Sequence, residues 1–233
     1  MAPLDFLSEF RAREGVNNHS KGKWYILAAA GLAAANKGEL MPELYRLATV
    51  DLPVEDRKVV QRRIKEALLK GAVLYGIPRS GQALGPLFQA LPPDEIDLYA
   101  PRTQAMNTEG ESERRVKRGR KYFETLWTPG PAQGMIDRIM MYHPDHYLLD
   151  VKTIYEFWIS DDSILSNIET QMCNTTLLTC WNAPVQAMWH TRGVVRYSGT
   201  LDKARFAQDM GLAIARQFDI QTGDITMVDD IVF

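Results

Sequence analysis

Apolar residues recur at helical spacing along most of the chain, with little of the strict alternation that marks a β-strand. After Thr200, large apolar residues stand four positions apart: Phe206, Met210, Ile214 and Phe218. Positions three and four apart share one face of an α-helix, so a stretch of this kind forms an amphipathic helix. The pattern therefore predicts an all-α protein.

Ten segments show this helical period. They cover residues 4–13, 23–36, 40–48, 54–75, 79–91, 112–127, 132–142, 146–159, 161–181 and 200–218. The last part of the chain, ITMVDDIVF, has the composition of a β-strand, and this is compatible with an extended tail.

A long connection divides the chain into two helical halves. Residues 92–113 combine prolines, acidic residues and small polar residues without any period. Each half contains an aromatic residue followed three positions later by proline, in Tyr75-Gly-Ile-Pro78 and Trp181-Asn-Ala-Pro184. Proline is accepted in the first turn of a helix, so each motif predicts a corner between two helices. We interpret residues 1–91 and 114–233 as a degenerate repeat.

Composition indicates a soluble globular protein with small-molecule partners. The 233 residues are 45% hydrophobic and carry a net charge of −2, which gives no general attraction to nucleic acid or to an anionic membrane. The most apolar run, WYILAAAGLAAA, has about half of the ~20 residues that span a bilayer. The first residues lack the pattern of a secretory signal, so the sequence predicts a cytoplasmic protein.

The second half resembles the carboxymuconolactone decarboxylase and alkylhydroperoxidase D-like superfamily over about 90 residues. The residues that carry the resemblance are His143, Pro144, Asp145, Tyr155, Cys173, Gln186, His190, Gly193, Gly199 and Thr200. In the first half, KEALLKGAVLYGIP is similar to the matching helix pair of two-repeat members. The resemblance implies an alkylhydroperoxidase D-like helical bundle that forms dimers, trimers or hexamers, with a cavity near the helix of His190.

The chain departs from the peroxidase branch of that superfamily. The positions of the branch's relay glutamate and of its two cysteines are occupied by Gln171, Ala183 and Gln186. Cys173 and Cys180 stand seven residues apart in one predicted helix, and at ~1.5 Å rise per residue they are too far apart for a disulfide. The sequence therefore predicts that this protein is not a thiol peroxidase.

His190 is the predicted catalytic acid or base, because imidazole titrates near neutral pH. Gln186 precedes it by one helical turn, and Arg192 is the candidate for holding an anionic oxygen. The aligned positions of the first half are Ser80 and Leu84, which imply no second acid-base centre. The predicted substrate-binding residues are Tyr75, Trp181, Gln171 and Cys173. A structural role for His190, such as capping a carbonyl group, remains open.

Other motifs in the sequence give weaker indications of function. His143, His146 and Asp150 have metal-ligand spacing, but Pro144 places His143 outside the helix, so a structural corner is favoured and no metal is predicted. The basic run ERRVKRGRKYF follows the acidic GESE and is interpreted as a solvated helix face. The chain lacks a glycine-rich phosphate loop, a nucleophile elbow and H-E-x-x-H, which favours chemistry without a cofactor.

Three functions are compatible with this pattern. The first is a cofactor-independent lyase or isomerase that uses His190 on a carbonyl-bearing substrate, by decarboxylation, lactone opening, dehydration or ring closure. The second is a non-catalytic binding or scaffold oligomer that kept the fold after losing the relay. A redox role for Cys173 or Cys180 acting singly is a third alternative.

Overall fold

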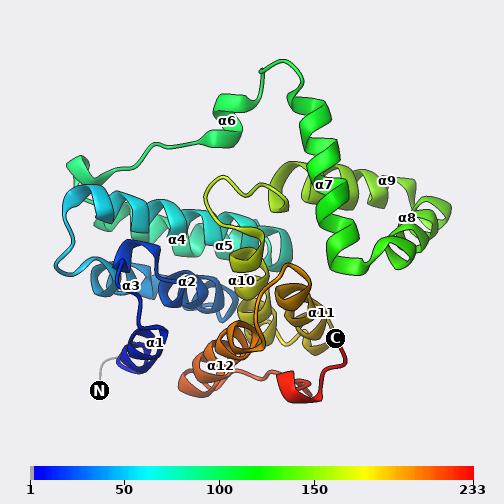
Figure 1. Ribbon diagram of the computed structural model, residues 1–233. Helices are drawn as coiled ribbons and strands as arrows, with labels where there is room; N and C mark the ends of the chain where they lie inside the picture. The colour runs from blue at the N-terminus through cyan, green and yellow to red at the C-terminus, as the bar shows by residue number, and fades with distance from the viewer. Residues whose placement is uncertain (1–2) are drawn as a thin grey trace.

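The computed structural model describes residues 3–233 and confirms the all-α prediction, since these residues form helices and no strand (Figure 1). The α-helices are α1 (Leu7–Glu14), α2 (Trp24–Ala34), α3 (Met41–Thr49), α4 (Val54–Tyr75), α5 (Ile77–Ala90), α6 (Pro101–Ala105), α7 (Glu111–Trp127), α8 (Pro129–Tyr142), α9 (Pro144–Tyr147), α10 (Asn167–Cys180), α11 (Pro184–Arg196) and α12 (Leu201–Gln217). Among the described residues, no helix is both long and apolar enough to cross a membrane.

Short helices of other types join them. Single turns of 3-10 helix are η1 (His19–Lys21), η2 (Gly38–Leu40), η3 (Pro93–Glu95) and η5 (Val228–Asp230). The segment η4 (Leu148–Ile159) is a π-helix that continues directly from α9. The C-terminal tail contains η5 and no strand, so the tail is not a β-element.

The main hydrophobic core is built around α10. This helix lies against α2, α11 and α12, and its residues from Thr170 to Cys180 are all buried. Every residue of α2 is buried as well, because its small side chains let the neighbouring helices approach closely. Helices from both predicted halves thus share one core. The division at residues 92–113 stays a prediction.

A second, smaller core joins α7, α8 and η4. Tyr122 and Phe123 of α7 pack against Tyr155 of η4, with ring centroids 6.0 Å and 4.6 Å apart. In Figure 1, α8 and α9 project to one side of the body as an arm. Gly119 allows α7 to approach η4, because a Cβ at this position would stand 2.6 Å from the Cα of Glu156.

Both predicted corners are confirmed. α4 ends at Tyr75, Gly76 adopts a φ of 88°, and α5 begins with Pro78 in its first turn. α10 ends at Cys180, and α11 begins with Pro184.

The predicted helix from Asp161 was too long at its start. α10 begins at Asn167, because Ser166 and Glu169 form a capping box there. Residues 161–166 instead form a turn that carries the buried carboxylate of Asp161.

We predict that Gly119→Ala lowers the free energy of unfolding by about 1–3 kcal/mol, because the added methyl group overlaps backbone atoms of η4. Gly134→Ala in α8 is the matched control, since no atom lies within 4 Å of its added Cβ, and we expect it to be neutral or to stabilise by up to ~1 kcal/mol. Urea unfolding of the three proteins measures both changes. Equal stabilities of the two variants would contradict the close contact of α7 with η4.

Candidate functional site

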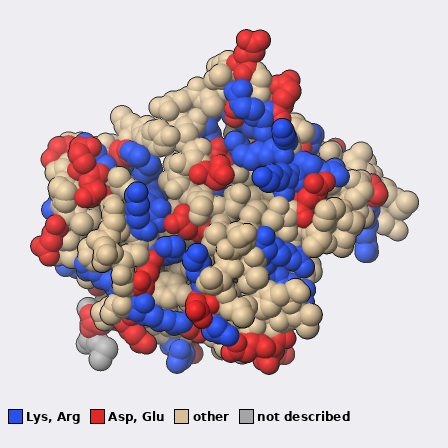
Figure 2. All heavy atoms as spheres, viewed as in Figure 1, with Lys and Arg blue, Asp and Glu red and all other residues tan. Residues whose placement is uncertain are grey.

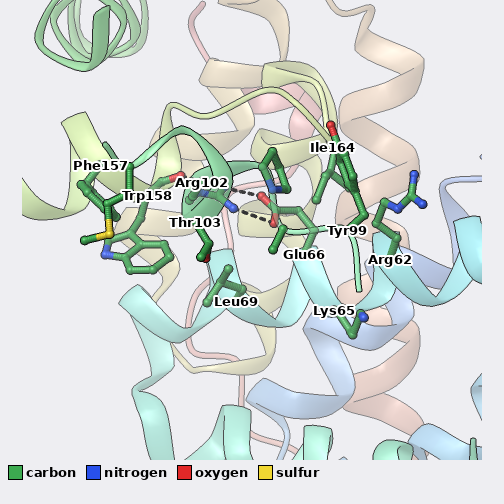
Figure 3. A pocket seen from close by; sticks show the side chains of 13 residues that line it. Arg62, Lys65, Glu66, Leu69, Tyr99, Arg102, Thr103, Phe157, Trp158 and Ile164 are labelled. Carbon is green, nitrogen blue, oxygen red and sulfur yellow. Dashed lines mark hydrogen bonds and ion pairs between the residues drawn. The ribbon is translucent and has the colours of Figure 1, made fainter. Parts of the chain in front are cut away.

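A cavity of about 440 Å³ lies between α4, the connection around α6 and the end of η4 (Figure 3). We call it the Trp158 cavity. Its wall is formed by Arg62, Lys65, Glu66, Leu69, Tyr99, Ala100, Pro101, Arg102, Thr103, Met106, Phe157, Trp158 and Ile164. Figure 3 shows Phe157 and Trp158 at one end and Arg62 and Tyr99 at the other. The wall is mainly apolar, with charged groups at a few places, as in many small-molecule sites.

Glu66 and Arg102 form a buried salt bridge at the cavity wall (Figure 3). The Nη1 and Nη2 atoms of Arg102 donate to the two carboxylate oxygens of Glu66 at 2.9 and 2.5 Å. Only 2% of Glu66 and 8% of Arg102 are exposed, so each charge depends on its partner to offset its desolvation. The Nε atom of Arg102 is buried and has no hydrogen-bond partner among the described residues.

Two further charged groups extend this pair into the core. The carboxylate of Asp161 lies 3.7 Å from Arg102 and 3.3 Å from Arg118. Burial opposes its ionisation, yet Arg102, Ser163 and Arg118 together lower its pKa. Lys70 lies 3.9 Å from Glu66 and donates to the carbonyl oxygen of Asp161 and to the hydroxyl of Thr170. Burial lowers the pKa of Lys70 to about 8.

Cationic groups and aromatic rings pack together along the cavity. The guanidinium of Arg102 lies 5.6 Å from the Trp158 ring centroid, and that of Arg62 lies 4.4 Å from Tyr99. Arg62 also donates twice to Asp97, at 3.0 and 2.8 Å. These contacts fix the basic side chains beside an apolar space.

His190 lies in a different place, inside the main core. It is 5% exposed, and it lines none of five cavities formed by the described residues. Its Nδ1 lies 2.7 Å from Oε1 of Gln171, whose Nε2 donates to the Tyr122 hydroxyl at 2.6 Å. An amide oxygen only accepts, so this contact places a proton on Nδ1, whereas the Asn174 Nδ2, which only donates, lies 3.3 Å from the same nitrogen. Burial lowers the pKa of His190 to about 4, so the imidazole is neutral at pH 7.

The structure does not gather the other predicted catalytic residues around His190. Gln186 is exposed on α11, although it precedes His190 by one turn. Arg192 donates from Nε to the carbonyl oxygen of Val232 at 2.8 Å. Residues four apart on a helix point in directions that differ by about 40°. Gln186 therefore lies just outside the buried face of α11, whereas His190 lies within it.

The predicted substrate-binding residues also separate. Gln171 contacts His190, and Gly193 leaves it the room to do so. Tyr75 is a core residue whose hydroxyl donates to the carbonyl oxygen of Leu68 at 3.0 Å. Trp181 lies on another surface, where the guanidinium of Arg79 is 4.6 Å from its ring centroid.

Both cysteines are enclosed in α10. Cys173 and Cys180 are free and buried, as expected for small hydrophobic residues. Burial raises the pKa of both thiols far above its ordinary value, so neither forms a thiolate readily.

The described residues contain no group of three His, Cys, Asp or Glu side chains that could hold a metal ion. His143 caps the start of α9 from outside the helix, as predicted from Pro144, and its Nδ1 accepts from the backbone N–H of His146. The side chain of His143 therefore stabilises the local fold of this corner.

Sequence reasoning missed the Trp158 cavity. One signal was present, because Arg63, Glu66 and Lys70 stand three and four residues apart on the helical face that also carries Ala67. Charged residues on the apolar face of a helix need partners from elsewhere. The partner of Glu66 is Arg102 of the connection, which has no periodic pattern.

Comparison with known proteins gives one distant relative. No family model matches the chain, and no solved structure matches it. Among curated proteins, the chain is similar to Peroxisomal protein 2 of Schizosaccharomyces pombe (strain 972 / ATCC 24843), with 23% identity over 207 residues. These residues are 86% of this chain and 90% of that protein.

We predict that Arg102→Met destabilises the protein by about 3–5 kcal/mol, because it leaves the carboxylate of Glu66 buried without its main partner. The double variant Glu66→Met with Arg102→Met removes both charges, and we expect it to lose less stability than the single variant. Chemical unfolding measures the difference. A double variant that is less stable than Arg102→Met would contradict a paired role for these charges.

We predict that His190 makes stability depend on pH. Its pKa is about 4 in the folded protein and about 6.5 in the unfolded chain, so protons bind the unfolded chain more tightly. This contribution is complete above about pH 6.5 and is lost as the pH falls towards 4. Between pH 7 and 4.5, the protein should lose ~2 kcal/mol more stability than His190→Gln. If the free energy of unfolding depended on pH equally in the two proteins, folding would not lower the pKa of His190, and the prediction would be wrong.

Proposed function

We propose that this protein binds a small molecule in the Trp158 cavity. The observation that carries the proposal is an apolar space of about 440 Å³ beside a buried arginine with an unused donor, the Nε of Arg102. Unpaired buried donors are rare in folded proteins. The Nε is itself covered by protein atoms, so a ligand oxygen provides the missing acceptor when the Arg102 side chain shifts towards the cavity. His190 in contrast is enclosed, neutral and outside the cavities, which supports the binding alternative over histidine catalysis.

The ligand class follows from the cavity wall. Leu69, Phe157 and Trp158 offer apolar and aromatic contacts, so the body of the ligand is apolar. The cations of the wall, Lys65 and Arg102 among them, are also paired with Asp97 and Glu66. Their remaining N–H groups favour a carboxylate or a carbonyl group in the ligand. We therefore propose an aliphatic or aromatic carboxylic acid, or a related carbonyl compound, as the ligand.

A lyase or isomerase that uses His190 is the second proposal. Its support is the contact of His190 with Gln171, because a buried neutral imidazole can exchange a proton when a substrate reaches its other nitrogen. This function requires α11 to move, since the described cavities do not extend to His190. Unchanged turnover by a folded His190→Ala variant would refute it.

The alkylhydroperoxidase D-like fold also remains a proposal. Its support is the pair of corners, α4 to α5 and α10 to α11, each with proline in the first turn of the second helix. A homo-oligomer is proposed with it, supported by exposed apolar residues at the end of α8 and the start of η4. These are Met140, Met141, Tyr142, Leu148 and Leu149.

The cytoplasm is the proposed location from the sequence. The name of the yeast relative, Peroxisomal protein 2, supports the peroxisome as an alternative. Imaging of a fluorescent internal fusion beside markers for both compartments distinguishes the two.

We predict that straight-chain carboxylates of six to twelve carbons bind about 10-fold more tightly than the alcohols of equal length, because hydrogen bonds to charged groups are stronger. Isothermal titration calorimetry measures the affinities. Leu69→Trp fills the cavity and should abolish binding, whereas Val54→Trp, at the far end of α4, should bind normally. Equal binding by the two variants, or equal binding of acids and alcohols, would contradict the proposal.

A further inference from the structure

A second cavity, of about 480 Å³, is lined by basic residues of α7 and α11. We call it the basic cleft. Its cations are Arg114, Lys117, Arg118 and Lys121 of α7, and Arg196 of α11, and its wall also includes the carboxylate of Asp162. Figure 2 shows basic side chains gathered over α7 on this face of the molecule. The cleft is separate from the Trp158 cavity, because the two share none of their lining residues.

Helical spacing explains why these cations converge. Arg114, Lys117, Arg118 and Lys121 stand three and four residues apart and so share one face of α7. The facing wall includes Arg196, Tyr197 and Ser198 at the end of α11. Like charges at such spacing repel each other. Ion pairs of Arg114 and Arg118 with acidic residues offset part of this repulsion.

These ion pairs neutralise only some of the charges. Arg114 is paired with Glu111 at 3.0 Å, and Arg118 with Asp161 at 3.3 Å. Among the described residues, no acidic group forms an ion pair with Lys117, Lys121 or Arg196.

The state of Arg196 is consistent with uncompensated charge. It donates to the carbonyl oxygen of Leu126, a neutral partner. Burial and then the nearby charge of Arg192 lower its pKa from the ordinary arginine value. An anion in the cleft would relieve this repulsion, and the two lysines would approach it from α7.

We propose that the basic cleft binds a small anion that carries two or more phosphate groups, such as a diphosphate-bearing metabolite. Cations from two helices can contact a compact ligand of high charge density from opposite sides, which a single carboxylate would not need. A long nucleic acid fits the surface less well, because two acidic residues stand there, Asp162 in the wall of the cleft and Glu113 in the first turn of α7. Inorganic pyrophosphate is therefore the simplest probe.

The test is calorimetric titration of the full chain with sodium pyrophosphate at low and at physiological salt. We expect one site per chain, with affinity that falls as salt rises. The double variant K117Q/K121Q should bind about 10-fold more weakly or worse. R120Q is the matched control, since Arg120 lies on α7 outside the cleft, paired with Glu124, and it should bind like the original protein.

Three outcomes would overturn the proposal. These are no binding of pyrophosphate at millimolar concentration, an equal loss in R120Q and K117Q/K121Q, and tight binding of a single-stranded RNA that pyrophosphate does not displace. Circular dichroism confirms that the variants are folded, which is expected because Lys117 and Lys121 are exposed. Carboxylate binding in the Trp158 cavity is measured separately, so either site can fail without the other.

Discussion

The salt bridge between Glu66 and Arg102, together with the nearby Asp161, joins three segments that lie far apart in the sequence. Glu66 belongs to α4, Arg102 to the connection after α5, and the nearby Asp161 to the turn before α10. Lys70 completes the set and reaches the backbone of that turn. Because each charge is buried, none can lose its partner without a large cost in free energy. The connection is therefore held against α4, and the Trp158 cavity exists because it is held there.

The fold separates two regions that the resemblance places together. The histidine region is a closed part of the core, where Gln171 links His190 of α11 to Tyr122 of α7. The region open to small molecules lies at the charged set, with Trp158 in its wall. Asp161 also contacts Arg118 of the basic cleft, so one carboxylate stands between the two cavities. Ligand binding is thus proposed at the two cavities and not at the enclosed histidine.

Local signals predicted most of the helices and little of the site. Pro78 and Pro184 act within a single turn, so both corners could be found from sequence. The start of α10 was placed too early, at residue 161, although Ser166 and Glu169 form a local capping box. Asp161 is instead held by Arg102, a long-range contact. Gln186 was placed beside His190 by its spacing alone. A residue at the border of the apolar face of a helix is buried or exposed according to the neighbouring elements, and residue spacing does not reveal these neighbours.

The central claim is that ligands enter the Trp158 cavity and not the surroundings of His190. Photo-crosslinking with a diazirine-bearing aliphatic carboxylate, followed by peptide mapping, tests it most directly. The account predicts labels on residues 99–106, on Leu69 or on Phe157 and Trp158, and their loss when excess unlabelled carboxylate is present. Labelling confined to α11, or labelling that the unlabelled acid does not reduce, would contradict it.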